Sequence, residues 1–213
     1  MVNAEKYIAL HTDLEKKNIT LVAVSKLKTV EDIQQLYDLG QRDFGENYVQ
    51  ELMDKQALLP ADIRWHFIGH LQSNKVKYIA SFIHLIQSVD SDRLLKEINK
   101  QAEKHGRQIN CLLQVHIADE QTKFGFDETE LKNTDLTQYP HLNIIGLMGM
   151  ATFSNDRGKV KAEFEKLHRL YENGNIKSSI LNTLSMGMSD DYPQAIECGS
   201  TMVRIGSLLF GRR

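Results

Sequence analysis

The fold of this chain is decided by a repeating unit, and the clearest example reads LVAVSKLKTVEDIQQLYDLG at residues 21–40. Its first four residues form an apolar, β-branched run that is typical of a buried strand. Apolar residues then recur with helical spacing from Val30 to Tyr37, which predicts a helix with one buried face. Thr29 is placed to cap this helix and Gly40 to end it. The segment therefore predicts one strand followed by one helix.

The same alternation continues to the end of the chain. Eight strands are predicted, at residues 21–24, 42–45, 65–68, 83–87, 111–117, 142–148, 179–184 and 202–205. Helices are predicted between them at about 30–39, 47–58, 74–80, 91–106, 159–171 and 191–197, after a further helix at the N-terminus. Strands separated by helices imply right-handed crossovers and a parallel sheet. We therefore expect one α/β domain over residues 1–213, a (β/α)₈ TIM barrel with an extra N-terminal helix, and an open doubly wound sheet is the alternative.

Composition excludes several classes of protein. The 213 residues carry 26 Lys+Arg and 28 Asp+Glu, a net charge of −2, so no basic field points to nucleic acid or an anionic membrane. The longest apolar stretches, such as 144–151, fall far short of the ~20 residues that a membrane-spanning helix needs. The N-terminus lacks a signal-peptide pattern, and the two cysteines form no CxxC motif. We expect a cytoplasmic protein.

In a barrel, functional side chains belong at the carboxyl ends of the strands. Lys26 directly follows the strand at 21–24, where desolvation lowers a lysine pKa and favours the neutral amine that condenses with an aldehyde. The alternative is a lysine that extends from the rim into solvent. Polar residues also follow the next strand, at 45–48, where a turn and helix cap would explain them equally well.

Two loops rich in small residues follow the last two strands. They read SMGMSDD at 185–191 and RIGS at 204–207. Loops at these places in a barrel often bind phosphate, because backbone N–H groups converge there. A lysine on the first strand, an arginine on the eighth and these loops together describe a pocket for a phosphorylated, aromatic aldehyde. Pyridoxal 5′-phosphate (PLP) is such a molecule.

Seven motifs occur in order along nearly the whole chain. They are AVSK at 23–26, FGENYVQE at 44–51, WHFIGHLQSNK at 65–75, KFG at 123–125, GLM at 146–148, LSMGMSDD at 184–191 and VRIGS at 203–207. Together they closely resemble the YggS/PROSC family of pyridoxal phosphate homeostasis proteins, and seven motifs in register are far more specific than any one. The resemblance implies a barrel like the N-terminal domain of alanine racemase.

The resemblance also implies roles for individual residues. Lys26 would hold PLP as an internal aldimine, and Arg204 would face the pyridine nitrogen. The other expected cofactor-binding residues are Ser189, Gly206 and Ser207 at the phosphate, with Asn47 and Ser185 close to the cofactor. The chain departs from the family at 27–29, which read LKT where TKP is more frequent, and at Ser207, which keeps the hydroxyl of the usual threonine.

A permanently charged guanidinium at the pyridine nitrogen disfavours ring protonation and so weakens the electron sink of PLP. Racemisation also needs a second acid/base on the opposite face of the substrate carbon. In alanine racemase that group comes from an additional β domain of the partner subunit, for which we expect no room here. We therefore expect a PLP-binding protein that buffers or delivers the cofactor with little or no turnover, and a PLP-dependent amino-acid racemase is the alternative. Expected partners are PLP and, transiently, PLP-dependent apo-enzymes, and we expect a monomer or a weak dimer.

A metal enzyme is a further class to weigh because the chain has eight histidines. His66 and His70 are four residues apart, but they lie in and after a strand-like segment, and no HExxH motif occurs. We expect no metal site. Cys111 is expected to be a small buried residue in its strand. The methionines expected to line or pad the barrel are Met148, Met150, Met186 and Met188.

Overall fold

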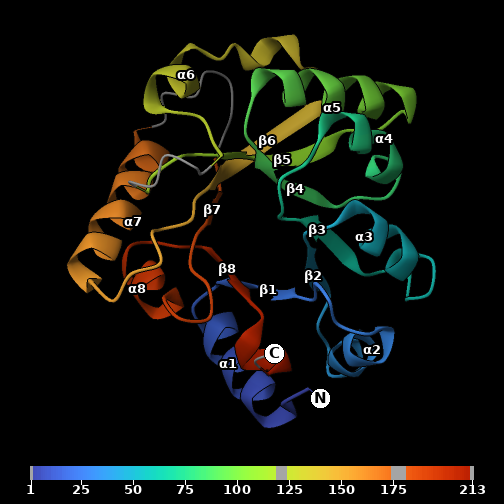
Figure 1. Ribbon diagram of the computed structural model, residues 1–213, viewed down its shortest axis with the longest axis vertical. Coiled ribbons are helices and arrows are strands. Elements are labelled where there is room, and N and C mark those ends of the chain that lie inside the picture. The colour runs from blue at the N-terminus through green and yellow to red at the C-terminus, as the bar shows by residue number, and fades with distance from the viewer. Residues whose placement is uncertain (1, 119–123, 174–180, 212–213) are drawn as a thin grey trace.

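The computed structural model describes residues 2–118, 124–173 and 181–211. Within them, eight parallel strands close into a ring in chain order, β1 pairing with β8, and helices surround the ring (Figure 1). The strands are β1 (Thr20–Val24), β2 (Asp43–Glu46), β3 (Arg64–Phe67), β4 (Leu85–Val89), β5 (Ile109–Gln114), β6 (Leu142–Met148), β7 (Thr183–Ser185) and β8 (Met202–Ile205). The predicted (β/α)₈ barrel is confirmed, and the open doubly wound sheet is wrong.

The helices cover the outside of the barrel. The α-helices are α1 (Ala4–Lys16), α2 (Val30–Asp38), α3 (Val49–Gln56), α4 (Val76–Ile79), α5 (Asp92–Lys104), α6 (Glu128–Asn133), α7 (Arg157–Glu172), α8 (Tyr192–Glu197) and α9 (Ser207–Phe210), with short 3₁₀ turns η1 (Ser73–Lys75) and η2 (Leu136–Gln138). The predicted N-terminal helix is α1. It lies beside α9, where the Asn3 N–H donates to the Leu209 carbonyl at 2.9 Å, so both ends of the described chain meet (Figure 1).

Helix α2 lies between the cap and the glycine predicted for it, and α5, which falls within the range predicted at 91–106, is bounded in the same way. The Thr29 hydroxyl accepts the Asp32 N–H at the start of α2 (3.2 Å), and Ser91 caps α5 in the same way. Each of these helices is followed by a glycine with positive φ, Gly40 at 103° and Gly106 at 61°. A side-chain oxygen satisfies a free N–H at one end of the helix, and glycine adopts the left-handed turn at the other end without steric cost.

Most differences from the prediction lie at the ends of elements. The sixth helix, α6, was not predicted because six residues show little periodicity, although Asp127 and Glu130 form a capping box at its start. Strand β5 ends at Gln114 rather than at 117, because the chain then turns to form an isolated bridge between Val115 and Phe126. The strand predicted at 179–184 begins outside the described residues, and β7 extends to Ser185.

The interior of the barrel is partly apolar and partly polar. A small apolar cluster fills it, formed by Val22, Leu85, Leu112, Met148 and Met202. A larger apolar cluster lies between the strands and the helices, and it contains Cys111 and Met186, as expected. Met150 packs against the inner cluster, but Met188 is 37% exposed, so its predicted place in the packing is wrong. Among the described residues, no helix combines the length and the apolarity needed to cross a bilayer.

Candidate active site at the barrel mouth

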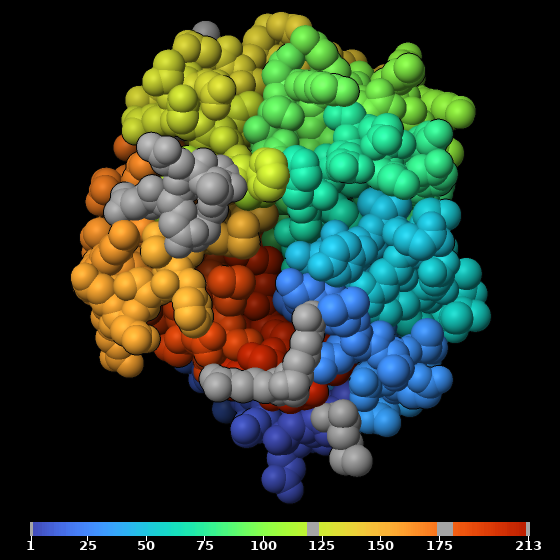
Figure 2. All heavy atoms as spheres, viewed as in Figure 1, coloured from blue at the N-terminus to red at the C-terminus, as the bar shows by residue number. Residues whose placement is uncertain are grey.

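The carboxyl ends of β1, β2, β7 and β8 meet at one mouth of the barrel. The Ser25 N–H, just after β1, donates to the Gly45 carbonyl of β2 at 3.0 Å. On the other side, a Cβ placed on Gly206 would lie 3.4 Å from the Val24 carbonyl oxygen, so the end of β8 touches the end of β1. Figure 2 shows a hollow on the viewed face whose floor is formed by red, C-terminal segments, with blue and orange segments at its border.

Lys26 is half-buried at this mouth. Within the described part of the chain, its amine makes no hydrogen bond or ion pair. Neighbouring lysines are engaged: Lys28 Nζ donates to the Phe210 carbonyl at 3.2 Å, and Lys55 is 5% exposed and makes three short contacts. Lys26 is therefore the amine that is free to react at the end of β1.

A buried cluster, the Lys55 cluster, fixes the backbone on both sides of Lys26; it consists of Ser25, Glu46, Glu51 and Lys55. Lys55 Nζ lies 2.7 Å from the Ser25 carbonyl, 2.7 Å from Glu46 Oε1 and 2.7 Å from Glu51 Oε1. The Ser25 hydroxyl donates to Glu46 Oε1 at 2.6 Å. Burial raises the pKa of Glu46, and the Lys55 charge opposes this shift.

The residue after Lys26 adopts an unusual backbone conformation. Leu27 has φ of +59°, a left-handed conformation that costs a non-glycine residue roughly 1–2 kcal/mol. Its N–H donates to the Glu51 carboxylate, which also accepts from Lys55. A strained backbone conformation persists only where contacts with the surrounding structure hold it in place. The Lys55 cluster therefore holds the loop that presents Lys26.

Arg204 points into the barrel and is 4% exposed. Its Nη1 donates to the Ser185 hydroxyl at 2.6 Å and its Nη2 to the Gly149 carbonyl at 3.0 Å. Burial lowers the pKa of Arg204 to about 10, with Asp191 opposing, so the guanidinium stays charged at neutral pH. No carboxylate of the described residues lies within salt-bridge distance of it. The barrel therefore contains a fixed cation whose charge suits an electron-rich ligand atom.

The loops after β7 and β8 lie against each other. The Gly206 N–H donates to the Ser189 hydroxyl at 3.3 Å, a long bond, and Ser207 follows as the first residue of α9. The loop after β7 turns at Gly187, whose φ is +96°. A Cβ at this position would lie 2.6 Å from the Ala195 Cβ, so only glycine leaves enough space for Ala195. This geometry brings Ser189, Gly206 and Ser207 together, as predicted.

Asn47 lies on the other side of the mouth. Gly69 allows the end of β3 to pack directly on it, since a Cβ at Gly69 would approach the Asn47 carbonyl oxygen to 2.4 Å. The side-chain oxygen Oδ1 of Asn47 is buried, and no residue that the structure describes hydrogen-bonds to it. Asn47 lines a cavity of about 400 Å³ together with Tyr48, His70, Lys75 and Tyr78. An orphaned buried acceptor beside a cavity fits a site that receives a polar ligand.

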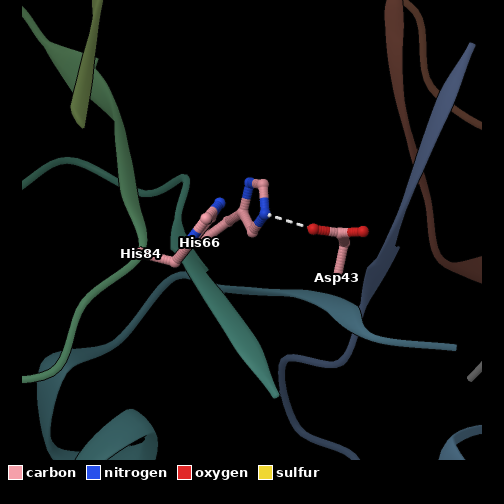
Figure 3. A group of neighbouring side chains, drawn as sticks. All are labelled: Asp43, His66 and His84. Atoms are coloured by element: carbon pink, nitrogen blue, oxygen red, sulfur yellow. Dashed lines mark hydrogen bonds and ion pairs between the residues drawn. The ribbon is translucent and has the colours of Figure 1, made fainter. Parts of the chain in front are cut away.

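Two of the histidines, His66 and His84, lie close to Asp43 at the opposite end of the barrel. Ligand-type atoms of Asp43, His66 and His84 lie within 4.8 Å of one another, and Figure 3 shows the His66–Asp43 contact. The Asp43 carboxylate is held by Arg64, whose Nε lies 2.8 Å from Oδ1, and both ring nitrogens of His66 are in hydrogen bonds. The ligand-type atoms of Asp43 and His66 are therefore already hydrogen-bonded, and the Arg64 cation opposes a metal ion at this place.

Comparison with known proteins identifies the family. The sequence model described as "Alanine racemase, N-terminal domain" matches residues 6–213. The pyridoxal phosphate homeostasis protein of Pasteurella multocida is 41% identical over 206 residues, covering 92% of this chain and 87% of that protein. The chain belongs to this family. The predicted resemblance to pyridoxal phosphate homeostasis proteins is thus confirmed.

Solved structures in and near the family share the barrel. The structure of PipY of Synechococcus elongatus, with PLP bound, is 35% identical and covers 98% of this chain and 99% of that one, with a TM-score of 0.90. An alanine racemase of Clostridium difficile is 14% identical with a TM-score of 0.79, covering 99% of this chain and 57% of that one. At that identity, the second comparison shows a common fold alone.

Several residues that shape this family member's site were missed from the sequence. Gln87, Gly149 and Lys55 contact the predicted residues, but no short motif marks them. The available signal was a polar residue within a buried strand, since β4 reads LIQSV and all five of its residues are buried. A buried polar side chain needs a partner, so Gln87 predicts a polar network inside the barrel.

Proposed function

We propose that this protein binds PLP covalently through Lys26 and takes part in intracellular PLP homeostasis, by buffering or delivery, with little or no turnover. The observation that carries the proposal is the free amine of Lys26, at a barrel mouth where the Lys55 cluster fixes the adjoining backbone. The names of the relatives and the PLP in the PipY structure support it. PLP, when bound, supplies an aldehyde that condenses with amines and a ring that acts as an electron sink.

Lys26 is the group that we assign to the aldehyde. Its Nζ adds to the aldehyde carbon, the carbon–nitrogen double bond forms, and the aldehyde oxygen leaves as water. Lys28 and Lys55 are less available because their amines are already hydrogen-bonded. Lys75 lies over the Tyr78 ring, 5.5 Å from its centroid, on the side of the mouth lined by Asn47. Lys123, a further rival, lies outside the described residues.

We assign Arg204 to the pyridine nitrogen. A guanidinium only donates hydrogen bonds, so it pairs with an unprotonated ring nitrogen and disfavours ring protonation. An unprotonated ring withdraws electrons weakly, which suits a protein that holds the cofactor rather than one that transforms amino acids. Ser185 and Gly149 hold the guanidinium in place, and Ser185 and Asn47 complete the surroundings of the ring.

We assign Ser189, Gly206 and Ser207 to the phosphate. The 3.3 Å bond between the Gly206 N–H and the Ser189 hydroxyl is long, and a phosphate oxygen would replace it with a shorter, charge-assisted one. Each charge-assisted bond is worth about 1.5–3 kcal/mol, so two of them correspond to a hundredfold or more in affinity. PLP is therefore expected to bind at least a hundredfold more tightly than pyridoxal. Equal affinities of the two in parallel titrations would remove the phosphate site.

The deciding experiment is chemical trapping of the cofactor. The protein is loaded with PLP, reduced with borohydride and mapped by peptide mass spectrometry, and we expect the pyridoxyl label on Lys26. Lys28→Ala is the matched control, two residues away, and it should leave the label in place. A label confined to Lys28 or Lys75 in the unmodified protein would overturn the assignment.

Turnover is tested separately. The loaded protein is incubated with L- and D-alanine in heavy water, and deuterium at Cα is followed together with optical inversion. We expect negligible racemisation. Rates of about 1–10³ s⁻¹, ordinary for enzymes, would instead establish the racemase alternative. Exchange without inversion would indicate a single base on one face, which we would assign to Lys26.

Delivery implies partners that accept the cofactor, and we propose PLP-dependent apo-enzymes as transient clients of a single-domain monomer or weak dimer. Delivery and buffering differ in kinetics. Direct transfer gives a rate that rises with the concentration of apo-enzyme, whereas release into solution gives a constant rate. Measuring the activation of an apo-enzyme by the loaded protein at several apo-enzyme concentrations distinguishes them.

A further inference from the structure

A row of buried polar side chains crosses the inside of the barrel from the mouth to the opposite end. Arg204 Nη1 donates to Ser185 Oγ at 2.6 Å, and Ser185 Oγ donates to Gln87 Oε1 at 2.7 Å. Gln87 Nε2 lies 2.9 Å from His66 Nδ1. His66 Nε2 lies 3.0 Å from Asp43 Oδ1, the contact drawn in Figure 3. The five side chains come from β8, β7, β4, β3 and β2, and none of these five residues is more than 9% exposed.

The two ends of this row fix the direction of every hydrogen bond in it. The Arg204 guanidinium can only donate. At the other end, Asp43 is an ionised acceptor: although burial opposes it, hydrogen bonds from Arg64 and His66 hold its pKa well below the usual range. His66 therefore carries its proton on Nε2 and accepts at Nδ1, a tautomer assigned from this network. The Gln87 amide must then present its NH₂ to His66 and its oxygen to Ser185.

We infer that Gln87 and His66 are positioning residues that orient Arg204, through Ser185, toward the cofactor ring. A serine hydroxyl has one hydrogen and two lone pairs, and the hydrogen of Ser185 is committed to Gln87. A lone pair is then left facing the guanidinium at 2.6 Å. Without the Gln87 oxygen, the hydroxyl can rotate and Arg204 keeps a fixed acceptor only at Gly149. The inference rests on the proposed function, since it assumes that Arg204 meets the pyridine nitrogen.

Gln87→Met tests the inference, because methionine has a similar length and lacks both polar atoms. The readout is the ¹⁵N chemical shift of PLP labelled at the ring nitrogen, measured in the loaded protein together with its apparent Kd and the Tm. We expect the shift to move and the Kd to rise about tenfold, which corresponds to about 1.4 kcal/mol, the scale of one neutral hydrogen bond. His66→Phe should change the ¹⁵N shift and the Kd in the same direction but by a smaller amount, because His66 is one hydrogen bond further from Arg204 than Gln87 is.

Two further variants separate positioning from a general loss of structure. Ser88→Ala is the matched control: Ser88 is the next residue of β4, is fully buried, and its hydroxyl has no hydrogen-bond partner among the described residues, so the ¹⁵N shift and the Kd should not change. The double variant Gln87→Met with Ser185→Ala tests the route. If Gln87 acts through Ser185, Gln87→Met should have little further effect on the Kd once Ser185 is alanine, so the two effects on Kd should not add.

The outcomes distinguish this inference from the proposed function. A lower Tm with a Kd within twofold and an unchanged ¹⁵N shift would make Gln87 merely structural and overturn the inference alone. Additive effects in the double variant would do the same. If the wild-type protein shows no cofactor bound at Lys26, the proposed function falls and the inference with it. Should Gln87→Met fail to fold, Gln87→Asn, which shortens the polar side chain by one methylene, is measured in the same way.

Discussion

Replacing Lys55 by methionine tests whether a buried charge holds the Lys26 loop. Lys55 and Glu46 are almost completely buried, and three contacts of 2.7 Å converge on Lys55 Nζ. The substitution keeps the length and most of the volume of the side chain and removes only the charge and the donors. Glu46 is then left in the interior with the Ser25 hydroxyl as its remaining donor.

Breaking a buried ion pair by removing one partner costs about 3–5 kcal/mol, because the other charge stays buried and uncompensated. A domain of this size has about 5–15 kcal/mol of stability in total, and each kcal/mol shifts its Tm by about 2–4 °C. We therefore expect Lys55→Met to lower the Tm by about 6–20 °C. The loss should shrink as the pH falls, because protonation of Glu46, whose pKa burial already raises, removes the charge.

Urea denaturation and thermal unfolding measure this loss of stability. Two further variants serve as controls that identify its cause. Glu46→Gln combined with Lys55→Met removes both charges and should lie within about 1–2 kcal/mol of the wild type. Lys132→Met breaks the Lys132–Glu128 pair, which has the same 2.7 Å separation but is about half exposed, and should cost less than about 0.5 kcal/mol. The comparison separates the effect of burial from that of distance.

Two results would refute this reasoning. A loss below about 1 kcal/mol for Lys55→Met would show that the contacts at Lys55 carry little net energy. A double variant no more stable than Lys55→Met would show that an uncompensated charge on Glu46 is not the cause. Borohydride labelling of the same variants connects stability to the site: with the Ser25 carbonyl released, Lys26 should be labelled more slowly in Lys55→Met than in Lys132→Met.

Three other predictions follow from single residues. Asp43 has a native pKa well below the about 3.9 of unfolded chains, so it contributes stability that is present above that value and lost as the pH falls below it. Asp43→Asn should therefore flatten the dependence of urea stability on pH between about 2 and 5, and an unchanged slope in that range would contradict this. Gly187→Ala should lower the Tm, because the new Cβ would lie 2.6 Å from the Ala195 Cβ and the backbone has a φ of +96° there. Gly158→Ala, on the exposed face of α7, is the control and should leave the Tm unchanged. Equal Tm values for the two variants would contradict this prediction. Cys111 is fully buried and burial raises the pKa of its thiol, so it should react with a thiol reagent only as the protein unfolds; rapid labelling of the native protein would show that the strand opens.

The sequence predicted the parts of this fold that depend on near neighbours. The alternation of strand and helix, the cap at Thr29 and the end at Gly40 all arise from residues a few positions apart, and they are present as expected. Short elements were less predictable. Helix α6 was missed, and the α4 segment is divided between a 3₁₀ turn and one turn of helix, because four to six residues carry too little periodicity.

The candidate site was predictable to the extent that strand ends and motifs define it. Lys26, Arg204 and the small-residue loops were found because a barrel places the carboxyl ends of its strands at one mouth. What the motifs could not indicate is which amine is free. Lys26 follows strand β1 and Lys55 belongs to helix α3, and only the tertiary contacts show that Lys55 reaches the end of β1, where two carboxylates and a carbonyl hold it.

By itself, then, the sequence determined the order and kind of the elements, the closed barrel as the preferred arrangement, the family and the residues that its motifs mark. The tertiary structure alone decided the partners of those residues. Ser185 and Gln87 are 98 positions apart, and Arg204 and Gly149 are 55 apart. Their contacts exist because ring closure in a fixed register directs side chains of distant strands into one interior. There, most buried polar atoms pair with a donor or an acceptor, and a local pattern does not record which one.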